Sequence, residues 1–418
     1  EVKKLPIGNY ILKEVEVPKT SGYVTINDVE FEIKDRLEVQ QVRVTQSVSK
    51  LEVHIFDELE NTKYVEGTKW QIVEKDTGKV KDEWVQDGNK HEVKKLPIGN
   101  YILKEVEVPS ELGYVTIEDK EFEIKDTLEV QQVKVTQSVS KLEVHIVDEL
   151  DNTKYVEGTK WQIVEKDTGK VKDEWVQDGN KHEVKKLPLG NYILKEIEVP
   201  SELGYVTIND VEFTIKDTLE VQQVREIQSV SKLEVHIVDE LDNTKYVEGT
   251  KWQIVEKDTG KVKDEWVQDG NKHEVKKLPL GNYILKEIEV PSELGYVTIN
   301  DVEFTIKDTL EVQQVREIQS VSKLEVHIVD ELDNTKYVEG TKWQIVEKDT
   351  GKVKDEWVQD GNKHEVKKLP LGNYILKEIE VPSELGYVTI NDVEFTIKDT
   401  LEVQQVRVTQ SVSKLEVH

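Results

Sequence analysis

The sequence predicts an all-β protein, built as a tandem array of immunoglobulin-like β-sandwiches of about 91 residues each. The string Glu-Val-Lys-Lys-Leu-Pro recurs at a constant step of 91 residues, beginning at Glu1, Glu92, Glu183, Glu274 and Glu365. Within each copy, short stretches of alternating polar and apolar residues are separated by turn signals, and no helical period is present. Alanine, the best helix former, does not occur.

Each copy is predicted to hold about seven short strands, read here in residues 138–228. The first, 140–146, alternates polar and apolar residues as a half-buried strand does. The β-branched and aromatic residues of the later stretches favour strands in the same way. These later strands are expected over 159–167, through Val171 and Trp175, near Val184, and over 191–199, 204–215 and 219–228.

Turn residues separate these strands. Glycine and proline mark chain reversals because glycine adopts positive φ and proline fixes φ near the turn value. Asp-Thr-Gly-Lys at 167–170 and Asp-Gly-Asn at 178–180 predict hairpins. Leu-Pro-Leu-Gly at 187–190 predicts a further turn. The long strand over 191–199 follows this turn and is ended by Pro200.

Composition excludes several classes of function. The chain has 57 basic and 85 acidic residues, a net charge of −28, which disfavours binding to nucleic acid. No stretch approaches the ~18 consecutive apolar residues of a membrane span. Cysteine is absent, which removes disulfides and thiolate nucleophiles. Methionine is absent too, so we expect the sequence to be a piece of a longer protein.

A sequence motif in every copy resembles a known family. Residues 187–196 read Leu-Pro-Leu-Gly-Asn-Tyr-Ile-Leu-Lys-Glu and are followed by Val199-Pro200 and Gly204-Tyr205. This resembles the LPxGxYxLxE…P…GY signature of Cna B-type, or SpaA-type, prealbumin-like domains. Val-Glu-Gly-Thr-Lys-Trp at 156–161 is similar to the entry into that family's second strand. The resemblance implies stalk or pilin-shaft domains of Gram-positive surface proteins.

The resemblance places the domain boundaries, which the period alone does not. The complete domains are expected at 47–137, 138–228, 229–319 and 320–410, called below the first, second, third and fourth copies. Residues 1–46 are then the C-terminal half of a truncated copy, and 411–418 the first strand of the next one. Because 183–273 and 274–364 are identical, we expect any functional site to recur in all copies or in none.

The family also implies a covalent cross-link, in which a first-strand lysine attacks a last-strand asparagine beside a buried acid. The acid position corresponds to Glu105, Glu196, Glu287 and Glu378. The lysine position is occupied by Ile55, Ile146, Ile237 and Ile328, and the asparagine position by Gln137, Gln228, Gln319 and Gln410. Isoleucine has no amine, so the isopeptide bond is predicted to be absent from every complete copy. A Thr–Gln ester is disfavoured because the first strand offers no threonine.

Other residues have weaker functional signals. If the acid is buried, we expect a hydrogen bond from the nearby glutamine amide or the backbone rather than a catalytic role. His145 is expected on an outward strand position and His182 before a strand, and neither has metal-ligand spacing. Residues 148–152 are interpreted as a solvated acidic turn rather than a calcium loop. Trp161 and Trp175 are expected to pack against each other rather than to stack on a ligand.

We therefore expect a non-enzymatic, extracellular structural protein, on the cell surface or anchored to the cell wall, acting as an extensible stalk or fibre. Its expected partners are neighbouring repeats and other copies of itself in a filament, with no cofactor, metal or nucleic acid. The alternative is an adhesin whose repeated faces grip a host matrix protein such as collagen. An exposed patch of Trp or Tyr repeated in each copy would favour the adhesin. Uniformly charged faces would favour the stalk.

Overall fold

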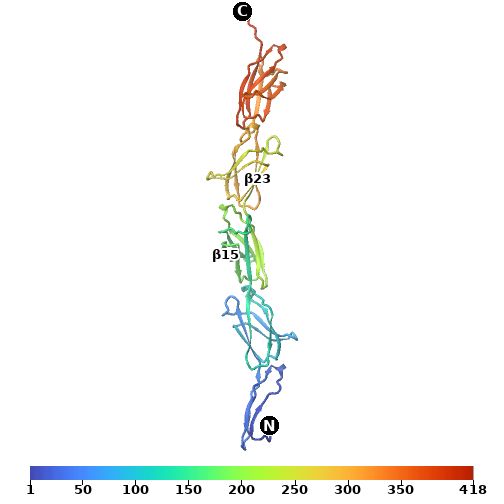
Figure 1. Ribbon diagram of the computed structural model, residues 1–418, viewed down its shortest axis with the longest axis vertical. Helices are drawn as coiled ribbons and strands as arrows, with labels where there is room; N and C mark the ends of the chain where they lie inside the picture. Colours follow the sequence, from blue (N-terminus) through green and yellow to red (C-terminus); the bar gives the residue numbers. More distant parts are fainter. Residues whose placement is uncertain (418) are drawn as a thin grey trace. The chain divides into compact units, whose positions relative to one another are not determined.

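The computed structural model describes residues 1–417. Its regular structure there consists of β-strands and five short 3-10 turns, without an α-helix among the described residues. Figure 1 shows each complete copy as strands gathered into two facing groups. The predicted all-β class and the tandem sandwiches are confirmed.

The first copy shows an architecture that the fourth copy shares. In the second and third copies the sheet that contains the first strand has only three strands, because Tyr205 and Tyr296 make isolated bridges there instead of a fourth strand. One sheet of the first copy has the strand order β10-β12-β5-β8 and the other β11-β9-β6-β7. The first and last long strands, β5 and β12, lie side by side in parallel, with Ile55 opposite Val135. The elements are β5 (Lys50–Asp57), β6 (Lys69–Glu74), β7 (Val80–Val85), β8 (Lys90–Lys94), β9 (Gly99–Glu107), η2 (Ser110–Leu112), β10 (Tyr114–Val115), β11 (Lys120–Ile124) and β12 (Gln131–Val139).

The other copies repeat this order. The N-terminal truncated copy has β1 (Gly8–Leu12), η1 (Lys19–Ser21), β2 (Tyr23–Val24) and β3 (Val29–Ile33), and β4 (Ser47–Val48), which pairs with β2, lies at the start of the first copy. The second copy has β13 (Lys141–Asp148), β14 (Lys160–Glu165), β15 (Val171–Val176), β16 (Lys181–Lys185), β17 (Gly190–Glu198), η3 (Ser201–Leu203), β18 (Val211–Ile215) and β19 (Gln222–Gln228).

The remaining elements follow in the same succession. The third copy has β20 (Lys232–Asp239), β21 (Lys251–Glu256), β22 (Val262–Val267), β23 (Lys272–Lys276), β24 (Gly281–Glu289), η4 (Ser292–Leu294), β25 (Val302–Ile306) and β26 (Gln313–Gln319). The fourth has β27 (Lys323–Asp330), β28 (Lys342–Glu347), β29 (Val353–Val358), β30 (Lys363–Lys367), β31 (Gly372–Glu380), η5 (Ser383–Leu385), β32 (Tyr387–Val388), β33 (Val393–Ile397) and β34 (Gln404–Val412).

The chain divides into two compact units. One comprises Glu1–Glu198 with Asn209–Gln228, and the other comprises Val199–Ile208 with the chain from Ser229 onward. The segment Val199–Ile208 therefore groups with the third copy, although its sequence belongs to the second. Its backbone explains this grouping, because Leu280 N–H donates a hydrogen bond to the Ser201 carbonyl.

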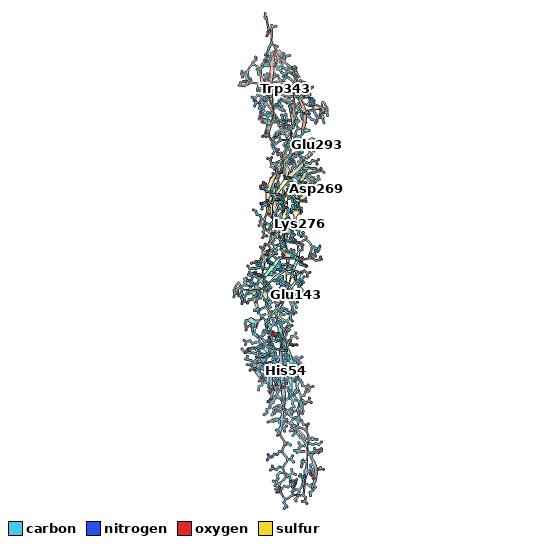
Figure 2. The ribbon with its side chains drawn as sticks, turned by 90° about the vertical axis from the view of Figure 1, so that its left-hand side faces the viewer. His54, Glu143, Asp269, Lys276, Glu293 and Trp343 are labelled. Atoms are coloured by element: carbon cyan, nitrogen blue, oxygen red, sulfur yellow. The ribbon has the colours of Figure 1, made fainter. Side chains whose placement is uncertain are left out.

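Alternating burial along the strands builds one core in each copy. In the first copy Trp70, Tyr101 and Leu103 are fully buried between the sheets. The Trp70 indole satisfies its polar N–H by donating to Gln86 Oε1 at 2.8 Å, as a buried indole must. Figure 2 labels Trp343, the equivalent of Trp70 in the fourth copy.

One predicted strand is wrong in its extent. The single strand expected over 204–215 is two separate pairings in different sheets. In the first copy, β10 pairs with β12, whereas β11 pairs with β9 in the opposite sheet. Between them the backbone N–H groups of Thr116 and Ile117 donate to side-chain carboxylates instead of a neighbouring strand. The chain crosses between the sheets at this point.

Candidate functional site: a buried carboxyl–amide pair and the joint between copies

The predicted acid and amide lie together in the core. Strand alternation on β9 points Glu105 inward beyond Tyr101 and Leu103, and Glu105 is only 8% exposed. Gln137, on β12, is fully buried. Its Nε2 donates to Glu105 Oε1 at 2.6 Å and to Thr68 Oγ1 at 2.6 Å. The structure thus brings two of the three predicted positions into contact.

The second carboxylate oxygen has a backbone partner. Ile117 N–H donates to Glu105 Oε2 at 2.8 Å. The fourth copy repeats both contacts, with Gln410 Nε2 on Glu378 Oε1 at 2.6 Å and Ile390 N–H on Glu378 Oε2 at 2.8 Å. The acid therefore has the amide and backbone hydrogen bonds that were expected for a buried carboxyl.

The middle copies keep the same buried positions. Glu287 Oε2 accepts from Ile299 N–H at 2.7 Å, and Gln319 Nε2 donates to the Val297 carbonyl at 3.2 Å. Glu196 and Gln228 are buried to the same degree as their counterparts.

The third position carries only hydrocarbon. Ile55 lies on β5, beside β12, and its neighbour two residues on, Asp57, is the register partner of Gln137. All four members of this set are fully buried in their cores: Ile55, Ile146, Ile237 and Ile328. At this place next to the carboxyl–amide pair the chain therefore presents methyl groups instead of an amine.

Burial controls the charge of the acid. Desolvation raises the pKa of Glu105 to about 7, and the Asp217 carboxylate of the following copy acts in the same direction. The hydrogen bonds from Ile117 and Gln137 oppose this shift. The pKa of Glu287 is likewise raised to about 7, and that of Glu378 is raised by the same burial.

A second cluster, which the sequence analysis missed, lies where one copy meets the next within each compact unit. We call it the joint. In the first unit, the turn Ser110–Leu112 of the first copy receives the Lys-Leu-Pro loop of the second. Leu189 N–H donates to the Ser110 carbonyl at 3.0 Å. Gly113 has a φ of +83°, and a Cβ added there would lie 2.3 Å from the Lys186 carbonyl oxygen.

A lysine crosses the joint. Lys186 Nζ of the second copy donates to Tyr114 OH at 2.7 Å and lies 4.4 Å from the centre of that ring. Tyr114 OH in turn donates to Asp57 Oδ2 at 2.5 Å on the first strand of the first copy. Although burial opposes it, the hydrogen bond from Tyr114 and the charge of Lys186 lower the pKa of Asp57.

A threonine–aspartate contact completes the joint and adjoins the buried acid. Asp217 of the second copy accepts hydrogen bonds from Thr116 N–H at 2.7 Å and Thr116 Oγ1 at 2.8 Å. The next residue, Ile117, binds Glu105. The same contact recurs in three other pairs: Thr25 with Asp126, Thr207 with Asp308, and Thr298 with Asp399.

No local sequence pattern marks the joint. The threonine and its aspartate are 101 residues apart, which is ten more than the repeat period, so the contact crosses from one copy to the next. The available signals were the Gly-Tyr pair after the turn and the Lys-Lys pair before Leu-Pro. Their meaning depends on how two copies pack.

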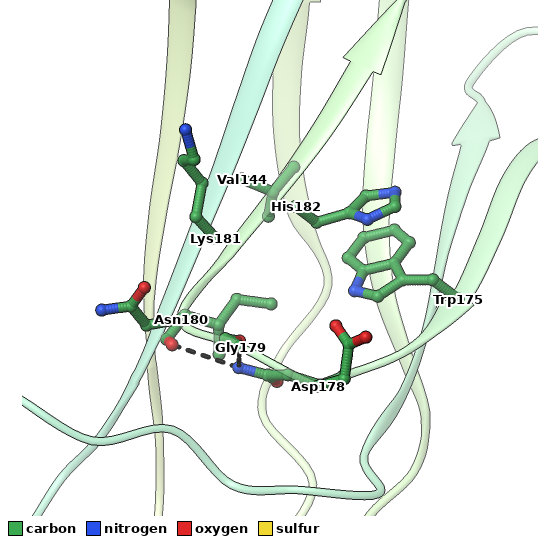
Figure 3. Close-up of a pocket in the computed structure, with 9 residues that line it drawn as sticks. Val144, Trp175, Asp178, Gly179, Asn180, Lys181 and His182 are labelled. Atoms are coloured by element: carbon green, nitrogen blue, oxygen red, sulfur yellow. Dashed lines mark hydrogen bonds between the residues drawn. The ribbon is translucent and has the colours of Figure 1, made fainter.

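The recurring tryptophan and histidine residues are structural. Trp161 is fully buried and stacks on Trp175, which confirms the predicted packing of the pair. His182 lies within β16, not before a strand as predicted, because its backbone pairs with Val144 of β13. Its ring stacks on Trp175, with 4.1 Å between the ring centres, and its Nε2 lies 2.7 Å from Asp173 Oδ2. Figure 3 shows the His182 ring against the Trp175 ring beside a cavity of about 10 Å³, room for a single water at most.

The acidic loop differs from the expected solvated turn at its first residue. Asp148 ends β13 and is buried, and one of its carboxylate oxygens accepts from Leu150 N–H at 2.8 Å. Across residues 1–417, no three His, Cys, Asp or Glu side chains are grouped so as to hold a metal ion. Over the same residues, no helix is long and apolar enough to span a membrane.

Comparison with known families gives a match over most of the chain. The family described as SpaA, prealbumin-like fold domain, matches residues 50–138, 140–227, 231–318 and 322–411. These ranges begin two or three residues after the predicted copies, whose boundaries stay a prediction. No curated protein sequence matches the chain.

Solved structures that resemble this chain include one further protein and two pilins. The TIE protein of Bacillus anthracis is 21% identical, covers 82% of this chain and 68% of its own, and has a TM-score of 0.36. A streptococcal ancillary pilin is 19% identical (65% and 99% covered, TM-score 0.30). BcpA, the major pilin subunit of Bacillus cereus, is 14% identical (87% and 99% covered, TM-score 0.22).

Proposed function

The chain belongs to the SpaA family of prealbumin-like fold domains, and from this we propose that it is the structural repeat region of an extracellular Gram-positive surface protein. In this proposal the copies form a stalk or fibre that acts as an extensible spacer. It lacks isopeptide bonds within its copies and has no enzymatic activity. Neighbouring copies, and other chains in a filament, are its partners.

One observation carries the proposal: the first-strand position beside each buried acid is an isoleucine. In the first copy Glu105 and Gln137 are 2.6 Å apart, so an acid and an amide are in place. Ile55 supplies no lone pair to attack the amide carbon. Only packing and hydrogen bonds therefore hold the first strand to the last, and a copy can open under load.

The outward faces support a spacer. In the second copy, the outer face of the sheet β15-β14-β17-β18 carries ion pairs that join its strands or the residues at their ends, beside the exposed Val176 and Ile197. They include Lys160 with Glu198, Lys166 with Glu212 and Lys195 with Asp210. Residues 183–273 hold 12 basic and 19 acidic residues, a net charge of −7, so neighbouring chains repel at close range.

The adhesin is the second candidate function, and one observation favours it. Tyr155 is 37% exposed and follows the exposed Leu150 by five residues, and both recur in every complete copy. The tryptophans, in contrast, lie inside or against the core. Immobilised collagen should retain neither the chain nor a variant with Tyr64, Tyr155, Tyr246 and Tyr337 changed to Ser. Retention that is lost in the variant would favour the adhesin.

The isopeptide prediction is tested by restoring the missing groups with Ile55→Lys and Gln137→Asn. The introduced amine would attack the side-chain amide carbon of the introduced asparagine, a C–N bond would form, and ammonia would leave as Glu105 transfers a proton. We expect the natural chain to have its full sequence mass and this variant to be lighter by one ammonia. Adding Glu105→Gln should restore the full mass of the variant. A natural chain lighter by one ammonia per copy would contradict the proposal.

A further inference from the structure

The two middle copies differ from both outer copies at two adjacent positions on the last strand. The first copy has Val135-Thr136 and the fourth has Val408-Thr409, whereas the middle copies have Glu-Ile at 226–227 and 317–318. The strand register is the same in both classes. Val135 lies opposite Ile55, and Glu226 lies opposite Ile146.

In the outer copies this register gives an ordinary strand. Val135 and Val408 point inward, are each 8% exposed and belong to the hydrophobic core. Thr136 and Thr409 point outward into solvent. Polar and apolar side chains therefore lie on the faces that suit them.

In the middle copies the polarity is inverted. Glu226 takes the inward position and is half-buried, and Glu317 does the same. Ile227 and Ile318 take the outward position and are 56% and 55% exposed. Each middle copy thus places a carboxyl where the outer copies place a valine, and exposes an isoleucine where they expose a threonine.

Few interactions offset the cost of burying the inward carboxyl of Glu226 and Glu317. Burial raises the pKa of Glu226 and of Glu317, and burial is the sole cause of either shift. Within residues 1–417, neither carboxylate receives a hydrogen bond or an ion pair, and the adjacent Arg225 points outward to Gln223. A half-buried charge without a partner weakens the packing around it.

The inversion lies in the strand pair that carries load. Tension enters the second copy at the start of β13 and leaves it at the end of β19, and these strands are parallel neighbours. Their load points are at opposite ends of the pair, so the strands are sheared and their hydrogen bonds resist together. Glu226 and Ile227 lie within this pair, opposite Ile146 and Val147.

We infer that the second and third copies are the yielding units of the array, which open under tension before the first and fourth. The inference rests on the proposed spacer function and deepens it. Extension would begin at the two copies with Glu-Ile and reach the Val-Thr copies only at higher load. The chain would then have two stages of extension encoded by two residues per copy.

Single-molecule pulling on the whole chain tests this inference. A copy of 91 residues extends to roughly 310–330 Å at 3.4–3.6 Å per residue. Subtracting a folded length of about 40 Å leaves steps of roughly 270–290 Å. We expect four such steps, two in a low-force group and two in a high-force group. Hydrogen exchange should be faster at 222–228 and 313–319 than at 131–137 and 404–410.

Matched variants assign the two groups to residues. Changing Glu226 and Glu317 to Val, with Ile227 and Ile318 to Thr, copies the sequence of the outer copies and should merge all four steps at the higher force. The reverse change, Val135→Glu with Thr136→Ile, should move a third step into the low-force group.

Three outcomes overturn the inference. Four steps at one force would show that the copies are equal, while the extensible spacer would survive. A low-force group that persists after the Val-Thr substitutions would show that position in the array, and not these residues, sets the order. A chain that does not extend before its handles detach would overturn the spacer function itself.

Discussion

The charge of Glu105 and of Glu287 depends on how far each carboxyl is buried away from solvent. Desolvation raises each pKa to about 7, and the carboxylate of the next copy, Asp217 or Asp399, adds to the shift. Hydrogen bonds from the backbone and from the glutamine amide act in the opposite direction. A single residue in the core thereby responds to the presence of the neighbouring copy.

This residue predicts a pH dependence of stability. The folded pKa, about 7, lies above the unfolded value of about 4.5, so the protonated acid is favoured in the folded state. Its contribution is complete below pH ~4.5 and is lost as the pH rises to about 7. The full change is about 3 kcal/mol for each acid. Urea unfolding of the whole chain should show stability falling over this interval.

The control is a chain with Glu105 and Glu287 changed to Gln, which keeps the side-chain size and cannot ionise. Its unfolding midpoint should fall less between pH 5 and pH 7 than that of the natural chain. Parallel pH curves for the two chains would show that these acids do not titrate on folding.

The 3-10 turn after each long inner strand is the element that makes the joint. Pro291 precedes the turn Ser292–Leu294, and Gly295 ends it with a φ of +83°. The turn holds the loop of the fourth copy, and Val297 beside it is fully buried. In the fourth copy the same position, Val388, is 40% exposed, since no further copy covers it among the described residues.

Two glycines separate the effect of the joint from that of backbone strain. A Cβ on Gly295 would lie 2.3 Å from the Lys368 carbonyl oxygen, whereas one on Gly386 meets only Ser413 Oγ at 3.8 Å. Both glycines have nearly the same positive φ, so each Gly→Ala change costs about 1–2 kcal/mol of backbone strain. Gly295→Ala should cost more, because it also forces the two copies apart.

Hydrogen exchange would measure this difference, because each substitution gives its own peptide a distinct mass. Exchange should increase over residues 292–299 in Gly295→Ala, where the Ser292 carbonyl accepts a hydrogen bond from Leu371 N–H at 3.1 Å. Gly386→Ala should change exchange only within its own turn. Equal effects of the two substitutions would mean that the joint adds nothing to stability.

Along the full chain, the pairing of first and last strands defines a folding unit. β13 lies parallel to β19, so the second copy closes its sheet only when both ends of 138–228 are present. A fragment of residues 138–228 should therefore fold as a cooperative monomer. A fragment of residues 92–182 has the same length but lacks β5 and β19, the parallel partners of β12 and β13, and leaves unpaired edges.

Thermal unfolding of the two fragments tests which pair of boundaries encloses a folding unit. We expect one sharp transition for 138–228 and none for 92–182. The segment Val199–Ile208 contacts the third copy in the whole chain, so the fragment should be less stable than the same copy in place. If 92–182 unfolds as sharply as 138–228, the predicted boundaries are wrong.

The period, most of the strands and the packing of the tryptophan pair could be predicted from the amino-acid order. Alternation is a local property, so residues 140–146 and 191–199 indicated their strands and Trp161 its place in the core without knowledge of any distant partner. The acid and amide positions followed from the resemblance to the family, because alternation alone left the inward face of that strand open. Their contact at 2.6 Å in the first copy required only that the two predicted strands lie in facing sheets.

The joint, the break in the strand expected over 204–215 and the place of His182 emerged only from the folded chain. Each depends on groups far apart in the sequence: Thr116 and Ile117 leave the strand pattern because Asp217 and Glu105 accept their N–H groups. The inversion at Glu226 could not be predicted from the sequence either, because Glu-Ile and Val-Thr both alternate polar and apolar residues. Which of the two residues faces the core is fixed by the register with the first strand, and register is a property of the folded pair.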